Sequence, residues 1–534
     1  MPTLNLHAFV RLLLLWCLCI TPHCLAAGPA RYFRIKVIDD QTGRGVPLVE
    51  LRTVHNLRFL TDSNGIAAFY EPGLMGEKVF FYVRSHGYEF RKDGFGFAGV
   101  ALDVKEGSSM EIKIKRLNLA ERLYRITGAG IYADSVLVGE KVPIRQPLLN
   151  AQVAGQDSTM AVPWRGKIYW FWGDTSRPRY PLGLFRVSGA TSLPPDRGGL
   201  DPAAGIELDY FVDREGFSRA MCPSEGPGPV WIEGLAVVRD EAGRDRLAAR
   251  YTRMKSLGEM LEHGLAVFDE KEQVFRKHNQ FDLKEQWRCP RGHPIAHKEG
   301  EVEYLLFAAP YATVRVRAEL KSVADPGSYE AFTCLEPGAR YDKKAARVER
   351  DSRGQLVYAW KPRTDSINAA EEQQLVAAGK IKPEEVRYQP RDLDGGKPVQ
   401  MHSGSIHWNA FRKQWILIAV QSFGSPSLLG EVWFAEAGAP TGPWRGAKKI
   451  VTHDKYTFYN PVHHPFFDQQ GGRIIYFEGT YASTFSGNPD PTPRYDYNQI
   501  MYRLDLADPR LARPVSQPAG SRHSEPSSNC ATSP

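Results

Sequence analysis

The sequence has few cysteines, no block of basic residues and no long apolar run beyond its N-terminus. Seven cysteines occur among 534 residues, and their spacing matches no zinc-binding pattern. Lysines and arginines are scattered, so we expect no nucleic-acid partner. No segment has the roughly 20 consecutive apolar residues that a spanning helix needs, so we expect no membrane span.

A short apolar run at the start of the chain is typical of an export signal. Arg11 precedes the run LLLLWCLCI (12–20), and the small residues Ala26 and Ala27 follow it. These features predict a signal peptide over residues 1–27 and a secreted or periplasmic protein. Export permits a disulfide, and two alternatives stay open: a bridge within one set of cysteines, or buried free thiols. The set is Cys222, Cys289 and Cys334.

Residues 31–117 carry short alternating apolar segments separated by turns, which predicts a small β-sandwich. The pattern VID-x-x-TG-x-GVPLVEL, followed by TDSNGIAAF and SHGYE, resembles the carboxypeptidase regulatory-like, transthyretin-like accessory domain. That resemblance implies a structural or adhesive module. A linker is expected over 118–150, and a disordered tail rich in Ser and Pro over 514–534.

A hairpin pattern of about 23 residues recurs five times between residues 151 and 508. Each copy has a polar opening, a short apolar strand, a polar turn and a stronger apolar strand. The copies span residues 156–175, 232–253, 292–311, 402–423 and 460–481. The repeat predicts a five-bladed β-propeller over 151–508. The fold class expected for the whole chain is therefore all-β, with the sandwich preceding the propeller.

Carboxylates occur where the strands of these hairpins start or end. Asp157 and Asp174 stand 17 positions apart at the two ends of the first hairpin, and Glu233 and Glu478 stand at matching positions of the second and fifth. Strand starts meet at one mouth of a propeller, so these four side chains are expected to converge there. Like charges brought together acquire shifted pKa values that catalysis uses. The structural alternatives are a turn cap for Asp174 and an ion pair with Arg for Glu233.

Two segments resemble known enzymes. GQDSTMAVPWRGKIYWFWGDT is similar to the opening blade of five-bladed glycoside hydrolases, most of all the domain-of-unknown-function 4185 group. EVWFAEAGAPTGPWRGAKKIV resembles an element of family 43 arabinanases and xylosidases. The resemblance places Asp157 and Asp174 on the Asp before the first strand and the Gly-Asp-Thr after the second. The family 43 general acid belongs to a Glu motif in blade three, where this chain has GHPIAH instead.

Hydrolysis of a glycosidic bond needs a proton donor and a base or nucleophile on opposite sides of the bond. We expect Asp157 to be the base or nucleophile, Glu233 the general acid, and Asp174 a positioning carboxylate; Glu478 is the alternative acid. The expected partner is a polysaccharide or oligosaccharide. The alternatives are a non-catalytic carbohydrate-binding propeller and a polysaccharide lyase, which would depend on a His or Tyr base and on Arg.

Other polar and aromatic residues at the hairpin ends are expected to contact the sugar. The predicted substrate-binding residues are Trp172, His293, Tyr311, His402, Gln421, Asn460 and Tyr481. Packing inside strands or between blades is the alternative for the rings. No catalytic metal is expected because no HExxH-type spacing exists, and no cofactor is expected. The resemblance leaves open a structural cation held by a histidine in the central channel.

Overall fold

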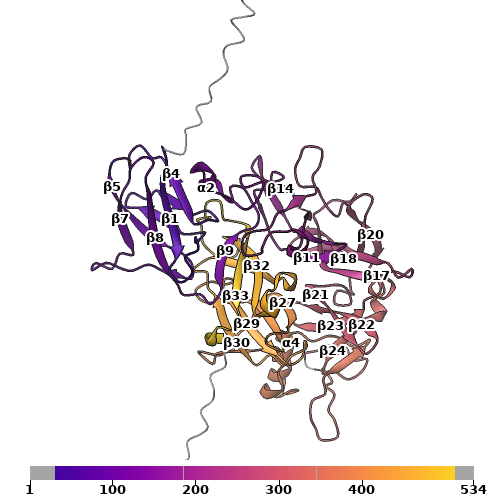
Figure 1. The fold of residues 1–534 in the computed structure, drawn as a ribbon. Coiled ribbons are helices and arrows are strands. Elements are labelled where there is room, and N and C mark those ends of the chain that lie inside the picture. The colour runs from indigo at the N-terminus through magenta and orange to yellow at the C-terminus, as the bar shows by residue number, and fades with distance from the viewer. Residues whose placement is uncertain (1–30, 185, 344, 512–534) are drawn as a thin grey trace, which may run out of the picture.

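The computed structural model describes residues 31–184, 186–343 and 345–511, which are built almost entirely of β-strands (Figure 1). This confirms the predicted all-β class. The predicted signal peptide and C-terminal tail lie outside the described residues. The α-helices are α2 (Ala133–Leu137), α3 (Leu320–Val323) and α4 (Ala369–Ala377). The 3-10 turns are η2 (Pro195–Arg197), η3 (Pro326–Ser328), η4 (Pro383–Glu385), η5 (Pro465–Phe467), η6 (Gln470–Gly472) and η7 (Pro509–Leu511). In the described part of the chain, no helix combines the length and apolarity needed to cross a membrane.

The first eight strands form two four-stranded sheets, which we call the N-terminal unit. One sheet has the order β4-β1-β8-β6, with β1 (Phe33–Asp39), β4 (Ile66–Phe69), β6 (Tyr88–Glu89) and β8 (Ser109–Arg116). The other has the order β3-β2-β5-β7, with β2 (Glu50–Thr53), β3 (Arg58–Leu60), β5 (Lys78–Arg84) and β7 (Gly99–Asp103). Apolar residues from both sheets form one core, and the polar residues of β8 alternate outward.

Five further sheets, which we call the large sheets, follow in chain order. The first contains β11 (Met160–Trp164), β12 (Lys167–Trp172), β15 (Ser188–Ser192) and β16 (Asp209–Tyr210). The second contains β17 (Val230–Arg239), β18 (Asp245–Ser256), β19 (Glu259–Asp269) and β20 (Val274–Gln280). The third contains β21 (His293–Glu299), β22 (Val302–Ala308), β23 (Ala312–Arg317), β24 (Glu330–Thr333) and β25 (Ala359–Pro362).

The fourth sheet contains β27 (Met401–Asn409), β28 (Gln414–Gln421), β29 (Val432–Ala437), β30 (Gly446–Val451) and β26 (Arg391–Asp392). The fifth contains β31 (Thr457–His463), β32 (Ile474–Ala482), β33 (Asn498–Asp505) and β9 (Glu121–Arg125). A small sheet of β10 (Gly155–Gln156), β13 (Thr175–Arg177) and β14 (Tyr180–Leu184) flanks the first. All five predicted hairpins are confirmed, because the first two strands of each large sheet pair antiparallel.

Consecutive large sheets pack face to face, which explains why their strands are apolar on both sides. In β12 every residue of the run IYWFW is buried, whereas an exposed sheet would alternate apolar with polar. One core lies between the first and second sheets, and others lie between the second and third, the third and fourth, and the fourth and fifth. A further core joins the fifth sheet to the first, through Tyr476 and Met501 on one side and Trp170 and Trp172 on the other.

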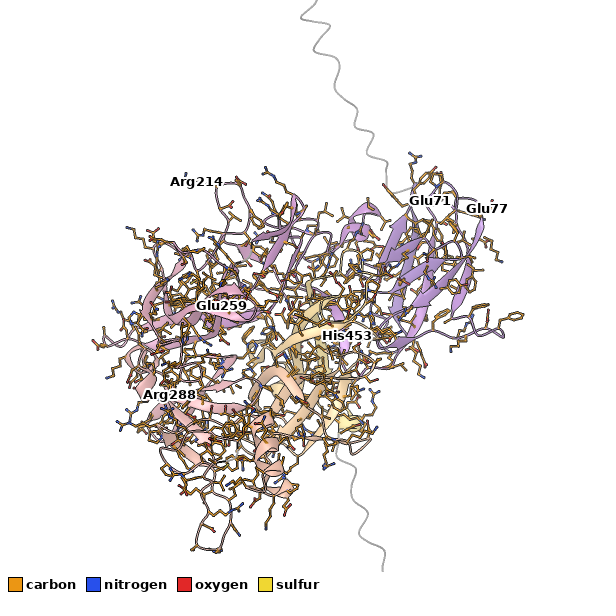
Figure 2. The ribbon with its side chains drawn as sticks, turned by 180° about the vertical axis from the view of Figure 1, so that it is seen from behind. Glu71, Glu77, Arg214, Glu259, Arg288 and His453 are labelled. Atoms are coloured by element: carbon orange, nitrogen blue, oxygen red, sulfur yellow. The ribbon has the colours of Figure 1, made fainter. Side chains whose placement is uncertain are left out.

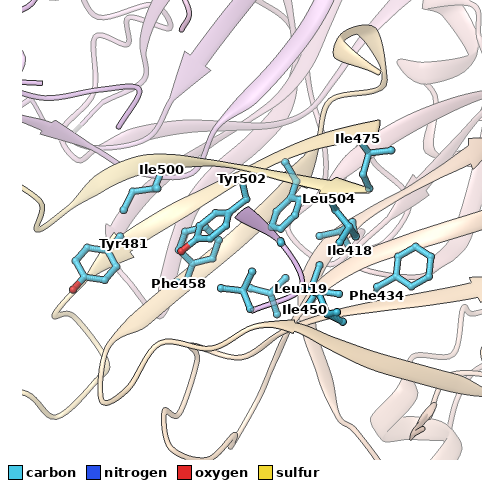
Figure 3. Close-up of a cluster of buried hydrophobic side chains, with 14 of the residues drawn as sticks. Leu119, Ile418, Phe434, Ile450, Phe458, Ile475, Tyr481, Ile500, Tyr502 and Leu504 are labelled. Carbon is cyan, nitrogen blue, oxygen red and sulfur yellow. The ribbon is translucent and has the colours of Figure 1, made fainter. Parts of the chain in front are cut away.

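The range predicted as a linker contains β9, which pairs with β33 as the outer strand of the fifth sheet. The N-terminal unit is thereby held against that sheet, and β9 lies between them in Figure 1. Tyr495 donates a hydrogen bond to the Thr61 carbonyl at 2.7 Å, and Arg494 pairs with Asp134 at 2.7 Å. Leu48 enters the core of the fourth and fifth sheets. Figure 3 shows that core, with Tyr481 at one end and its hydroxyl pointing away.

The insertion between the third and fourth sheets contains α4, where the Asn368 side chain and Glu371 form a capping box. Cys222, Cys289 and Cys334 are buried free thiols.

Candidate active site

The first strands of all five large sheets line one cavity of about 400 Å³. The lining includes one or more residues of each strand, among them Met160 of β11, Leu235 of β17, His293 of β21, His407 of β27 and Val462 of β31. Asp157 stands three residues before Met160, and Glu233 stands two residues before Leu235, so both carboxylates are close along the chain to residues that line the cavity.

Asp157 precedes β11 and is held by two tyrosines. The Tyr459 hydroxyl donates to Oδ2 at 2.8 Å, and Tyr497 makes a second side-chain hydrogen bond to the same carboxyl. A Cβ on Gly173 would lie only 2.2 Å from Asp157 Oδ1, so a side chain there would displace the Asp157 carboxyl. Burial raises the pKa of Asp157 to about 6; the negative charge of Asp174 adds to the rise, and the tyrosine hydrogen bonds oppose it. The carboxyl therefore changes charge near neutral pH.

Asp174 follows β12 and faces the second sheet. Trp231 Nε1 donates a hydrogen bond to its Oδ1 at 2.8 Å. Burial raises the pKa of Asp174, and that hydrogen bond lowers it in part. Trp231 and Glu233 stand two residues apart in β17, so their side chains leave the strand on the same face. Asp174 and Glu233 are thus brought to one side of the second sheet.

Glu233 is anchored by a buried arginine. Arg250 Nη1 lies 2.5 Å from Glu233 Oε1, and the Gly292 amide lies 3.5 Å from Oε2. Arg250 is itself fixed by a hydrogen bond to His263 Nδ1 at 3.1 Å. The side chain of Glu233 is 39% exposed, whereas that of Arg250 is only 5% exposed. The arrangement presents the Glu233 carboxyl to solvent and keeps the Arg250 guanidinium buried.

Left-handed backbone conformations gather around Asp157. Ser158, Asn460, Tyr497 and Phe485 have φ values of 54°, 49°, 61° and 64°. Each such residue costs on the order of 1–3 kcal/mol, and this kind of strain concentrates at functional sites. Asn460 Nδ2 donates to Ser158 Oγ at 2.7 Å, which ties the fifth sheet to the residue after Asp157. Asn460 therefore lies next to Asp157, and its role in substrate binding stays a prediction.

An exposed aromatic ring borders the group. Phe485, in the loop after β32, is 55% exposed and packs edge-on against Tyr459 with ring centroids 6.1 Å apart. A large exposed ring beside an ionisable carboxyl is suited to stacking on the face of a sugar.

Glu478 lies elsewhere. It is fully buried, His464 Nε2 lies 2.7 Å from Oε1, and Thr159 donates to Oε2 at 3.1 Å. Its carboxyl is sealed between the first and fifth sheets, so in this structure it faces no solvent and no substrate. The catalytic role expected for Glu478 conflicts with this placement.

Three of the predicted sugar-stacking rings are also sealed. Trp172, Tyr311 and Tyr481 are 0%, 4% and 0% exposed. Trp172 stacks on Trp170, Tyr311 stacks on Tyr388, and Tyr481 stacks on Tyr456. These rings fill the cores between sheets, which was the alternative reading of strand aromatics. Only the hydroxyl edge of Tyr481 reaches a surface cleft.

The remaining predicted residues fall into two places. His402 is exposed beside Ser403, and Gln421 accepts a hydrogen bond from Trp433 Nε1 at 2.9 Å. His293 lines the cavity, where burial and nearby His464 lower its pKa to about 4. His407 lines the same cavity, and burial lowers its pKa as well. Neutral imidazoles are thus favoured in the cavity.

Across residues 31–184, 186–343 and 345–511, no three His, Cys, Asp or Glu side chains are arranged to hold a metal ion.

Sequence reasoning did not assign Tyr459, Tyr497 or Arg250 to the site. Tyr459 directly precedes the predicted Asn460, so its position at a strand start was a usable signal. Arg250 had no such signal, because it lies within β18, and Tyr497, directly before β33, stands at the start of a third strand that the repeat did not single out.

No protein-family model and no curated protein matches the sequence. Solved structures align with the structure of this chain. An exo-β-1,3-galactanase from Phanerochaete chrysosporium aligns at 11% identity over 72% of this chain and 64% of its own, with a TM-score of 0.36. An exo-1,5-α-L-arabinanase from a bovine ruminal metagenomic library aligns at 10% identity over 66% and 94%, with a TM-score of 0.32. A GH43 enzyme from Xanthomonas citri, complexed with xylotriose, aligns at 13% identity over 67% and 88%, with a TM-score of 0.31.

The chain spans less than two thirds of the galactanase's length.

Proposed function

We propose that this chain is an exported glycoside hydrolase, secreted or periplasmic, that cleaves a polysaccharide at one mouth of a five-bladed β-propeller. The sheet order supports the propeller, since each large sheet shares a core with the next and the fifth shares one with the first. The cavity lined by all five first strands corresponds to the channel of such a fold.

The observation that carries the activity is the Asp157 carboxyl. It is partly exposed, has a pKa of about 6, and has Asp174 as an electrostatic neighbour. Two carboxyls with raised pKa values that lie near one another are what acid–base cleavage of a glycosidic bond requires. Strained backbone and the exposed ring of Phe485 surround them.

We assign Asp157 as the base or nucleophile, because the Tyr459 hydroxyl donates to it and so stabilises its ionised form. Glu233 is already engaged by the buried Arg250 guanidinium, so we assign it to binding of a sugar hydroxyl. We therefore assign proton donation to Asp174, whose pKa is raised and whose side-chain partner is a neutral indole N–H. This exchanges the roles that the sequence suggested for Asp174 and Glu233.

The lyase alternative is disfavoured by the same contacts. Burial raises the pKa of Tyr459 well above its ordinary value, which makes it a poor base. Arg250 is buried and already engaged with Glu233 and His263, so it is not placed to neutralise an acidic sugar.

Leaving-group dependence tests these roles. Once a polysaccharide substrate is found, turnover of that polymer is compared with turnover of the 4-nitrophenyl glycoside of its sugar. Asp174→Asn should lose about 10²–10⁴-fold on the polymer but much less on the nitrophenyl glycoside, whose leaving group needs no proton. Asp157→Asn should lose activity on both. If Glu233→Gln, and not Asp174→Asn, loses much activity on the polymer but little on the nitrophenyl glycoside, the acid is Glu233.

A further inference from the structure

The N-terminal unit and the fifth sheet enclose a cleft of about 640 Å³, separate from the five-strand cavity. Sites for small ligands fall in the range of about 300–1,000 Å³. From the N-terminal unit its walls include Arg52, Arg58 and Arg84; from the other side they include Asp454, Tyr456 and the loop 486–492. Figure 2 shows this boundary from behind, with His453 where the unit meets the large sheets.

The cleft has a fixed floor. His86 Nε2 lies 2.8 Å from the Tyr481 hydroxyl, and Tyr481 stacks on Tyr456 with ring centroids 4.1 Å apart. The same hydroxyl lies 3.0 Å from Thr492 Oγ1. These contacts join both walls at the base, so the cleft is a preformed feature of the folded chain.

The charges of the cleft indicate a neutral ligand. Four cations (Arg52, Arg58, Arg84 and Lys455) face three carboxylates (Glu50, Asp454 and Asp490), a surplus of one. Arg58 pairs with Glu50 at 2.7 Å, and Arg84 pairs with Asp454 at 2.5 Å. Arg52 lies 3.9 Å from Glu50. Since every arginine has a carboxylate partner, the walls offer alternating donors and acceptors, which suit hydroxyl groups better than an anion.

The cleft adjoins the candidate active site. The loop after β32 lines the cleft with Ser486 and Asn488, and its Phe485 packs on Tyr459, which bonds Asp157. Thr480, next to Tyr481 of the cleft floor, accepts the Ser158 amide at 3.0 Å. One loop and one strand end thus separate the two places.

We propose that this cleft is a second binding site for the polysaccharide. It holds a neutral oligosaccharide segment of the same chain whose glycosidic bond is cleaved at Asp157. The link to cleavage rests on the proposed function, but the binding itself does not. The cleft would hold a long chain at a distance from the bond being cut, so short substrates would not use it.

Calorimetric titration tests the cleft without turnover. The Asp157→Asn protein is titrated with neutral hexasaccharides of xylose, arabinose, galactose and glucose, with the matching disaccharides, and with hexagalacturonate. The cleft variant adds Arg52→Ala and Arg84→Ala. Its matched control adds Arg91→Ala and Arg317→Ala, two exposed arginines outside the cleft. A neutral hexasaccharide should bind, and the cleft variant should bind it at least about tenfold more weakly than the control.

Several outcomes overturn the proposal: no neutral hexasaccharide binds, only hexagalacturonate binds, or the cleft variant and the control bind equally. Wild-type turnover is measured separately. Cleft-dependent binding without hydrolysis of any polymer supports the cleft and contradicts the proposed function. Hydrolysis of a polymer by wild type, together with equal binding by the cleft variant and the control, supports the proposed function and contradicts the cleft.

Discussion

Asp157 and Glu478 are both acidic residues at strand ends of the hairpin repeat, yet their surroundings differ completely. Asp157 is partly exposed, is held by neutral tyrosine hydroxyls, and has a pKa of about 6. Glu478 is fully buried and paired with His464 and Thr159. The first environment leaves a carboxyl available for proton transfer. In the second, the carboxyl joins the fifth sheet to the start of the first sheet. Position within a repeat does not distinguish these uses; the partners do.

The largest expected difference concerns turnover. Asp157→Asn should lower kcat on the identified polymer by about 10³-fold or more, because the base or nucleophile is removed. Glu478→Gln should keep kcat within a few-fold of wild type, because its carboxyl touches no substrate. Equal losses in the two variants, both shown to be folded by circular dichroism, would erase the distinction between the regions.

Stability should show the opposite order. Glu478→Ala leaves His464 and Thr159 without their buried partner and should lower the free energy of unfolding by about 3 kcal/mol. Glu233→Ala, a substitution of the same type at a half-exposed site, should cost less, although Arg250 loses a partner. Urea unfolding at pH 7 measures both, and a smaller loss for Glu478→Ala than for Glu233→Ala contradicts the structural role.

Asp157 should destabilise the fold when it is ionised. Its pKa is higher in the folded chain, about 6, than the ordinary value of 3.8. The penalty is absent below about pH 4, grows between pH 4 and 6, and is complete above that. Asp157→Asn cannot ionise, so it should be more stable than wild type by about 3 kcal/mol at pH 7, with the gain vanishing near pH 4. Thermal unfolding across this range provides the test, and a gain independent of pH refutes the assigned cause.

The smallest effect concerns the tyrosine contact. The Tyr459 hydrogen bond lowers the pKa of Asp157, so Tyr459→Phe should raise it. The acidic limb of the kcat/KM profile should then move to higher pH by about one pH unit. Tyr329→Phe, which removes a buried hydroxyl bonded to the Val323 carbonyl, is the matched control and should leave the limb in place. An unmoved limb in Tyr459→Phe shows that Asp157 does not set it.

Much of the fold could be predicted because it depends on local patterns. Alternating or continuous apolar runs and polar turns identified the five hairpins. The role of β9 could not be predicted in this way. Its pairing with β33 joins residues more than 370 positions apart, and only tertiary packing selects it from the many short apolar segments available.

The candidate site was predictable in part for the same reason. Asp157, Asp174, Glu233 and Asn460 stand at strand starts or ends, and such positions repeat along the sequence. The burial of these positions, in contrast, differs from one hairpin to the next. Nothing local in the sequence around Trp172 or Tyr311 distinguishes a ring at a rim from a ring in a core, because neighbouring sheets decide which of them is covered.

The central claim is that the carboxyls around Asp157 hydrolyse glycosidic bonds. The most direct test is reducing-sugar release from a panel of plant and bacterial polysaccharides, with wild type and Asp157→Asn assayed side by side at pH 7. The account predicts release by wild type from at least one polymer and none above background by Asp157→Asn. No release from any polymer by wild type, or equal release by both proteins, would contradict it.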